Sequence, residues 1–155
     1  MDNKYIKLAD KEESQVVKWL HSGCSKDQAR GILTGIHIKN GQTYSADRFK
    51  LMRINTPESL TEFEGMTIKP LTNIPAAPAV IEWEVIDGHF PDCEQIIATD
   101  KEEVFSFSVN KKLLASAIDK MPGDVMITFS FTGSVEPMRI TNGDALLVVM
   151  PMKAR

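Results

Sequence analysis

The feature that most constrains the fold is a continuous apolar run near the end of the chain, Leu146–Met150, which is followed by Pro151. An uninterrupted apolar run of this length predicts a strand that is buried on both faces. Proline has no backbone N–H, so it ends the pairing of this strand or places the strand at an edge. The run therefore predicts a last strand that only completes a core, or one that also carries the flexible thioethers of Met150 and Met152 to a binding surface.

A helix is predicted near the start of the chain, after a short strand over Tyr5–Leu8. Asp10 and Glu13 have the spacing of a capping box, in which two side chains accept hydrogen bonds from free backbone N–H groups at a helix start. Apolar residues then recur at helical spacing until Gly23, which is expected to end the helix.

The middle of the chain contains strand and turn signals. β-Branched residues predict a strand over Ile32–Ile38, and Asn40-Gly41 predicts a hairpin turn because both residues tolerate positive φ. The partner strand is expected from Thr43 to about Ile54. Proline-rich sequence without helical spacing then predicts a loop-rich connection over residues 56–77, with one strand near Met66–Ile68.

The final third has the most regular patterns. Alternating apolar residues predict strands over Val80–Ile86, Phe105–Val109 and Val125–Phe131. Asn110 is expected to cap a helix between the second and third of these strands. A turn at Asn142-Gly143 is expected to join the last two strands of the chain.

The order strand–helix–strand–strand thus occurs twice. Antiparallel hairpins combined with two helices predict an α+β fold, with both helices on one face of antiparallel sheets. The length of 155 residues predicts a single domain over residues 1–155, in which the range 56–77 connects the two halves.

Composition narrows the classes of protein to consider. A formal net charge of -3 argues against a chain that is basic all over, although one face can still be basic. No apolar run reaches the roughly 18 residues needed to cross a bilayer, so no membrane association is expected. Two cysteines do not form a disulfide framework, which predicts a reducing, cytoplasmic location.

Catalytic and metal chemistry has little support in the sequence. His21, Cys24, His89 and Cys93 would suffice for a tetrahedral zinc site or a thiol–imidazole pair. The two His/Cys pairs lie far apart, however, and neither contains a Cys-x-x-Cys spacing. No phosphate-binding loop or Ser-His-Asp order is present. We therefore expect no catalytic residue, no metal site, no cofactor and no enzymatic activity.

Four segments resemble, in family order, parts of bacterial DNA sliding clamps, the β subunit of the replicative DNA polymerase. Val148–Lys153 is similar to the Val-Met-Pro-Met-Arg-Leu end of that family, and Asn110–Asp119 is similar to the last helix of its third domain. Val85–Asp92 resembles its Val-Asp-Gly-Arg-Phe-Pro-Asp segment. Arg30–Ile36 and Tyr44–Leu51 together resemble a strand pair that ends in Ala-Thr-Asp-Gly-His-Arg-Leu.

The chain also departs from the clamp pattern. The family's chain carries three such domains and closes as a dimer, whereas this chain has the length of one. Arg48 stands where the family has Gly, and Phe49 where it has His. The chain ends in Ala154-Arg155 where the family ends in Leu. The resemblance therefore implies a shortened, single-domain relative of the clamps.

The resemblance implies a non-enzymatic replication factor that holds double-stranded DNA weakly and without sequence specificity. Cations that contact phosphates carry no base information, so such a contact can slide. Arg30 matches a loop arginine that faces DNA in the family, and the other candidates are lysines: Lys11, Lys18, Lys26, Lys111, Lys112 and Lys120. A solvated helix face would explain the same lysines without DNA.

The resemblance also implies a groove for short linear peptides of replication or repair proteins. The matching positions are Lys50, Leu51, Val148, Val149, Met150, Pro151 and Met152. A closed core without a groove is the alternative for these residues. A second functional class stays open, namely a stand-alone peptide-binding module that never encircles DNA. Encirclement by a single domain would require self-assembly into a ring.

Overall fold

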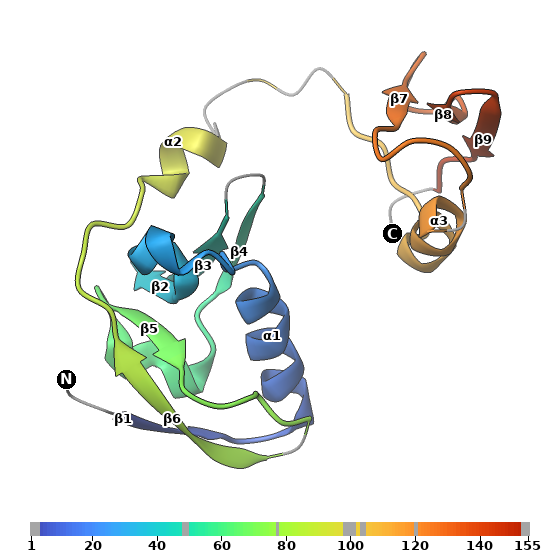
Figure 1. Cartoon of the computed structure of the whole chain (residues 1–155). Coiled ribbons are helices and arrows are strands. Elements are labelled where there is room, and N and C mark those ends of the chain that lie inside the picture. Colours follow the sequence, from blue (N-terminus) through green and yellow to red (C-terminus); the bar gives the residue numbers. More distant parts are fainter. Residues whose placement is uncertain are drawn as a thin grey trace. The chain divides into compact units, whose positions relative to one another are not determined.

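The computed structural model describes residues 4–47, 50–76, 78–97, 102, 105–119 and 121–152. The chain divides into two compact units, Met1–Thr99 and Asp100–Arg155, which are described separately below (Figure 1). The range 56–77, expected to connect two halves, lies within the first unit. The expectation of one domain over residues 1–155 stays a prediction.

The first unit is built on a six-stranded antiparallel sheet with the strand order β1-β6-β5-β2-β3-β4. Its strands are β1 Lys4–Leu8, β2 Ile36–Lys39, β3 Gln42–Ala46, β4 Leu51–Asn55, β5 Thr67–Pro70 and β6 Ala79–Val85. Two α-helices, α1 Lys11–Ser22 and α2 Cys93–Ile97, and two 3₁₀ segments, η1 Gln28–Thr34 and η2 Glu58–Phe63, complete the unit. The antiparallel pairing confirms the α+β class.

The helix α1 begins and ends where the sequence predicts. Asp10 accepts a hydrogen bond from the backbone N–H of Glu13 at 2.8 Å, and the Glu13 carboxylate accepts one from Ala9 N at 2.7 Å. The predicted cap at Asp10 is therefore formed, whereas the Glu13 carboxylate binds the N–H one residue before the N-cap rather than that of Asp10. Val17 and Leu20 are fully buried in a core that the strands and η2 complete. The other buried members of this cluster are Ile6, Leu8, Cys24, Ile36, Ile38, Leu60, Phe63, Ile68, Ile74, Ile81 and Trp83.

The hairpin signal at Asn40-Gly41 is confirmed, with φ values of 53° and 70° and Lys39 opposite Gln42. The single strand expected from Thr43 to Ile54 is wrong, because this range folds into the antiparallel pair β3 and β4. Asp47 makes the turn between them by accepting a hydrogen bond from Lys50 N at 2.9 Å. The strand expected over Ile32–Ile38 begins only at Ile36, because η1 occupies the preceding residues.

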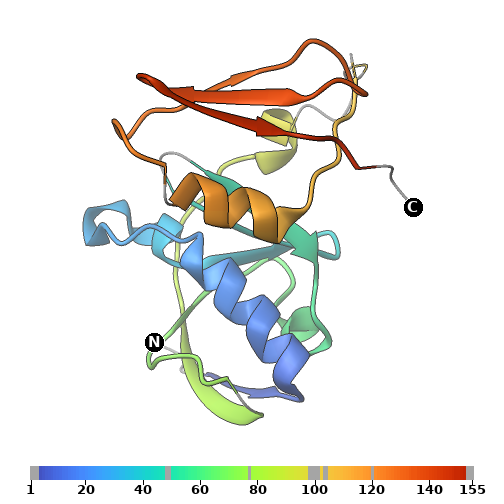
Figure 2. The same ribbon diagram turned by 90° about the vertical axis from the view of Figure 1, so that its right-hand side faces the viewer.

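The second unit contains the helix α3 Lys111–Asp119 and a three-stranded antiparallel sheet. The strands are β7 Thr128–Ser130, β8 Met138–Asn142 and β9 Ala145–Val149, in that spatial order. Asn110 caps α3 as predicted, since its side chain accepts from Lys112 N at 3.0 Å and Leu113 N at 3.1 Å. In Figure 2, α3 lies along one face of this sheet. Half-buried residues that include Leu114 and Ile118 pack there on a core of Met138, Ile140 and Val149.

The expectation that the terminal strand is buried on both faces is wrong. Leu146 and Val148 of β9 are 57% and 49% exposed, because alternate residues of a strand point to opposite faces and the core of the unit covers only the face of Leu147 and Val149. The strand expected over Val125–Phe131 is shortened to β7, and no strand forms over Phe105–Val109. Within the described residues, no helix is long and apolar enough to cross a membrane.

Candidate functional site

The largest gathering of predicted DNA-binding residues in one unit lies around the C-terminal half of α1. Three adjoining hollows of about 360, 520 and 370 Å³ follow this end of the helix. Neighbouring hollows share lining residues, so they form one continuous surface. We call it the basic surface and define it by its cations and one histidine: Lys18, His21, Lys26, Arg30, Lys50 and Lys69.

Local geometry explains why these residues come together. Gly23 follows α1 at a point where a Cβ atom would overlap Met52 Sδ and Ser45 Oγ, so the chain passes close to the β3–β4 hairpin only because glycine stands there. The next loop then carries Lys26 past this hairpin. Asp27 caps η1 by accepting from Ala29 N at 3.0 Å, which fixes the turn that carries Arg30.

Carboxylates neutralise part of the basic surface. Arg30 Nε lies 3.4 Å from Asp27, Lys50 Nζ lies 3.6 Å from Asp47, and Lys69 Nζ lies 3.7 Å from Glu84. The pair of Arg30 is exposed and that of Lys50 partly so, and ion pairs in contact with water are weak, so a phosphate can compete for these two cations.

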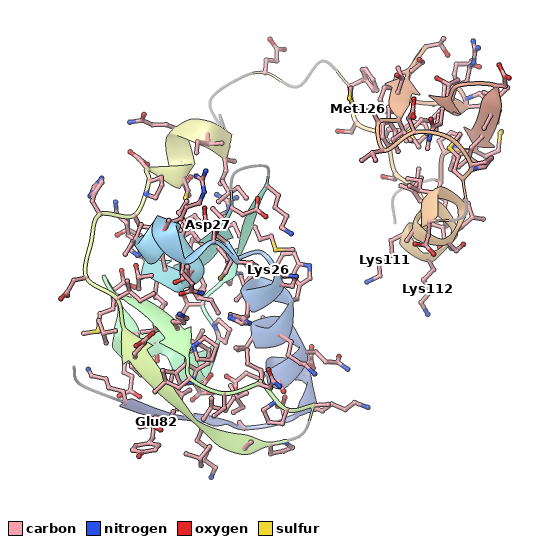
Figure 3. All side chains as sticks on the ribbon, in the orientation of Figure 1. Lys26, Asp27, Glu82, Lys111, Lys112 and Met126 are labelled. Carbon is pink, nitrogen blue, oxygen red and sulfur yellow. The ribbon has the colours of Figure 1, made fainter. Side chains whose placement is uncertain are left out.

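Lys18 and Lys26 are different, because the described part of the chain places no ion-pair partner on either of them. Figure 3 labels Lys26 beside the end of α1, with Asp27 close by, directly before η1. These two lysines are the cations that a ligand could reach without breaking an existing ion pair.

The histidine of this surface and the cysteine beside it are both favoured in their neutral forms. Burial, helped by the charge of Lys69, lowers the pKa of His21, which favours a neutral imidazole. Burial raises the pKa of the Cys24 thiol to about 12, and Cys24 Sγ donates to the carbonyl of Leu20 at 3.8 Å. The reactive form of cysteine is the thiolate, which this environment disfavours. Among the described residues, no three His, Cys, Asp or Glu side chains converge to hold a metal ion.

The remaining DNA candidates lie elsewhere. Lys11 is exposed in the first turn of α1, between the acidic residues Asp10 and Glu12. Lys111 and Lys112 belong to the second unit and project from the first turn of α3, away from the sheet of that unit (Figure 3). Lys120 lies outside the described residues. Within the first unit, the structure therefore groups Lys18, Lys26 and Arg30 and places Lys11 at the other end of α1.

The tail of the second unit presents an apolar row. Leu146, Val148, Met150 and Met152 alternate with less exposed residues and are 57%, 49%, 64% and 53% exposed. We call these four residues the tail row. The tail is held in place beyond Pro151, because Met152 N donates to the carbonyl of Ser108 at 2.7 Å.

The predicted groove residues do not all line one surface of a unit. Val149 is only 3% exposed and belongs to the core of the second unit, so it supports the tail row from beneath. Lys50 and Leu51 belong to the first unit, where Leu51 packs against Tyr44, Ala46 and Phe90. Pro151 is half-buried between two exposed methionines.

Sequence reasoning missed three residues of these surfaces. Lys69 joins the basic surface from β5, and His21 contributes from the last turn of α1. Leu146 joins the tail row because its side chain lies on the face of β9 that the core does not cover. No sequence pattern indicates the exposure of Leu146, because residues 145–150 are all apolar.

No family model and no curated protein sequence matches the chain. Among solved structures, the chain is similar to the C. crescentus β sliding clamp, crystallised with polyethylene glycol bound at a region proposed to tether the β-motif. The TM-score is 0.62 at 15% identity, over 96% of this chain and 50% of that chain. A DnaN sliding clamp (DNA polymerase III subunit β) from Bartonella birtlesii, bound to griselimycin, aligns with a TM-score of 0.43 at 13% identity, over 98% of this chain and 66% of that chain.

Proposed function

We propose that this chain, which has the fold of bacterial β sliding clamps and spans about half the length of the C. crescentus clamp chain, acts in DNA replication as a non-enzymatic clamp-like factor. Its two roles would be to hold double-stranded DNA without reading its sequence and to dock short peptides of replication or repair proteins. Three observations support these roles: the clamp-like fold, the basic surface and the tail row.

The observation that carries the DNA role is the basic surface. Lys18 and Lys26 are exposed and have no ion-pair partner in the described part of the chain, and Arg30 lies beside them on a loop fixed by Asp27. Cations of this kind attract phosphates from solution and contact the backbone rather than base edges. The carboxylates of Asp27 and Asp47 lower the positive potential of the basic surface. We therefore expect weak DNA binding that is lost as the salt concentration rises.

A DNA titration tests this role. Lys26→Glu combined with Arg30→Glu should weaken binding of a fluorescent duplex at about 50 mM salt and reduce the slope of log affinity against log salt by about 1 for each phosphate that the variant no longer neutralises. Lys7→Glu combined with Lys39→Glu makes the same charge change away from the basic surface and serves as the matched control. Equal losses of affinity in both double variants would remove the basic surface from the proposal.

The second candidate function is the stand-alone peptide-binding module. The tail row favours it, because exposed apolar side chains of an edge strand offer anchors for a peptide without any contribution from DNA. In that case the wild-type chain would bind the peptide but would show no DNA binding that depends on the basic surface.

A further inference from the structure

A second kind of site lies at the opposite end of α1 from the basic surface. Ala9, Asp10, Val16, Ile54 and Glu58 are among the residues that line a pocket of about 470 Å³ where the start of α1 meets β4 and η2. This volume falls in the range of roughly 300–1,000 Å³ that is usual for binding pockets. We call it the acidic pocket.

The floor of the acidic pocket is apolar and held firmly. Val16 and Ile54 are half-buried and pack against the main core of the unit. Pro57, also half-buried, contributes a rigid ring beside them. Apolar surface of this kind is favourably covered by an apolar side chain of a ligand.

The rim of the acidic pocket is negatively charged. Asp10, Glu12 and Glu58 are exposed, and among the described residues that line the pocket none is basic. Lys11 lies between two of these residues in the sequence but does not line the pocket. The rim thus favours a ligand that carries cations around an apolar centre.

The start of α1 does not offer a site for anions here. The side chain of Asp10 accepts from Glu13 N, and the Glu13 carboxylate accepts from Ala9 N and from Ser59 N at 2.9 Å. The first of these bonds occupies the N–H of Glu13 in the first turn, and the Glu13 side chain adds a carboxylate to the pocket. The bonds of the Glu13 carboxylate also fix α1 to η2, so the two walls of the pocket keep their spacing.

We propose that the acidic pocket docks a peptide segment of a partner protein in which one or two apolar side chains are flanked by Lys or Arg. The apolar side chain would cover Val16 and Ile54, while the flanking cations would reach Glu12 and Glu58 on opposite walls. Long basic side chains suit this rim because their methylene stems lie on apolar surface while their charges stay in water. This inference is independent of DNA binding and of the tail row.

The test uses the full chain and peptide libraries. One library carries two adjacent apolar residues flanked by Lys and Arg, and the matched library carries Asp and Glu at the same flanks. We expect the basic library to yield binders and the acidic library to yield none. Glu12→Lys combined with Glu58→Lys should weaken those binders about tenfold at low salt, since the reversal removes two attractions and adds two repulsions.

Glu62→Lys is the control, because Glu62 is an exposed carboxylate on η2 that does not line the pocket. NMR of the labelled chain should show amide shifts on peptide addition at Ala9, Glu12 and Asn55. Equal enrichment of both libraries, no binders from either, or equal weakening in Glu62→Lys would overturn the proposal. So would self-association that Glu12→Lys with Glu58→Lys abolishes, because the pocket would then be an interface between copies of this chain.

Discussion

Glu13 connects two parts of the first unit through a single carboxylate. It accepts hydrogen bonds from Ala9 N before α1 and from Ser59 N in η2, at 2.7 and 2.9 Å. The side chain therefore caps the helix and fixes the segment that follows β4. A residue with two such bonds should matter more for stability than its exposed neighbours.

Replacing Glu13 tests this role. Glu13→Ala should lower the free energy of unfolding by about 1–2 kcal/mol near neutral pH, the usual cost of losing a helix cap and a charge-assisted hydrogen bond. Urea unfolding followed by circular dichroism measures the change. Glu12→Ala, an exposed carboxylate in the same turn, is the control and should stay within about 0.5 kcal/mol of wild type.

The effect of Glu13→Ala on the free energy of unfolding should depend on pH. Burial alone would raise the pKa of Glu13, but the hydrogen bonds from Ala9 and Ser59 outweigh it and leave the pKa below 4.5. A pKa that folding lowers adds stability above the unfolded value and loses it as the pH falls through the folded value. The gap between wild type and Glu13→Ala should therefore narrow below about pH 4.5. A gap that stays constant down to pH 3 would contradict this account.

At the scale of elements, the end of β9 is buried, whereas the tail that follows it is largely exposed. Val149 is buried, whereas Met150 and Met152 are exposed, and the only backbone bond of the described tail beyond Pro151 is that of Met152 N to Ser108. Deleting Met152–Arg155 should therefore abolish docking of a clamp-binding peptide while the fold survives. The loss in stability should be about 1 kcal/mol, well below the roughly 2–5 kcal/mol of a buried Met→Ala change.

Peptide titration and thermal melts of both forms measure these effects. Met150→Ser gives a second, milder variant of the tail row. Met126→Ser is its matched control, because Met126 is an 85% exposed methionine elsewhere in the same unit (Figure 3). Unfolding of the truncated chain would show that the tail belongs to the core, and unchanged binding would show that the tail row is not the docking surface.

The sequence predicted best those features that neighbouring residues decide among themselves. Two helix caps and one turn depend only on residues within a few positions of one another, so the sequence alone can predict them. They are the caps at Asp10 and Asn110 and the turn at Asn40-Gly41. The turn after β3 was missed because it depends on Asp47, without a glycine or proline to mark it. The burial of β9 was misjudged because an apolar run does not show whether one face or both faces of its sheet are covered by other elements.

The basic surface was predicted only in part, because some of its residues come from distant parts of the sequence. Lys18, Lys26 and Arg30 are close in sequence, so helix and loop geometry brings them together. Lys69 reaches the same surface through the pairing of β5 with β2, and no local pattern indicates that pairing. The ion pairs Arg30–Asp27 and Lys50–Asp47 join residues only three positions apart, but the sequence analysis did not predict them.

For the whole molecule, self-assembly decides between the two candidate functions. A chain of this length can surround a duplex only together with other copies, through a head-to-tail contact that closes. If the clamp-like factor encircles DNA, light scattering at high concentration should give a mass of several chains, with or without DNA. A strictly monomeric mass under both conditions would exclude the ring and leave the stand-alone peptide-binding module.

The pairing of β1 with β6 has a consequence for how the first unit folds. In this pair Lys4 lies opposite Trp83, so one of the first residues of the chain meets a residue near the end of the unit. The hairpins β2–β3 and β3–β4 need only local closure and can form early, whereas contacts between distant residues form slowly. On the ribosome, β1 is synthesised long before its partner strand emerges. Its apolar residues Ile6 and Leu8 belong to a core that is complete only when β2, β5 and β6 have been made, and until then the nascent chain depends on its surroundings for protection from aggregation.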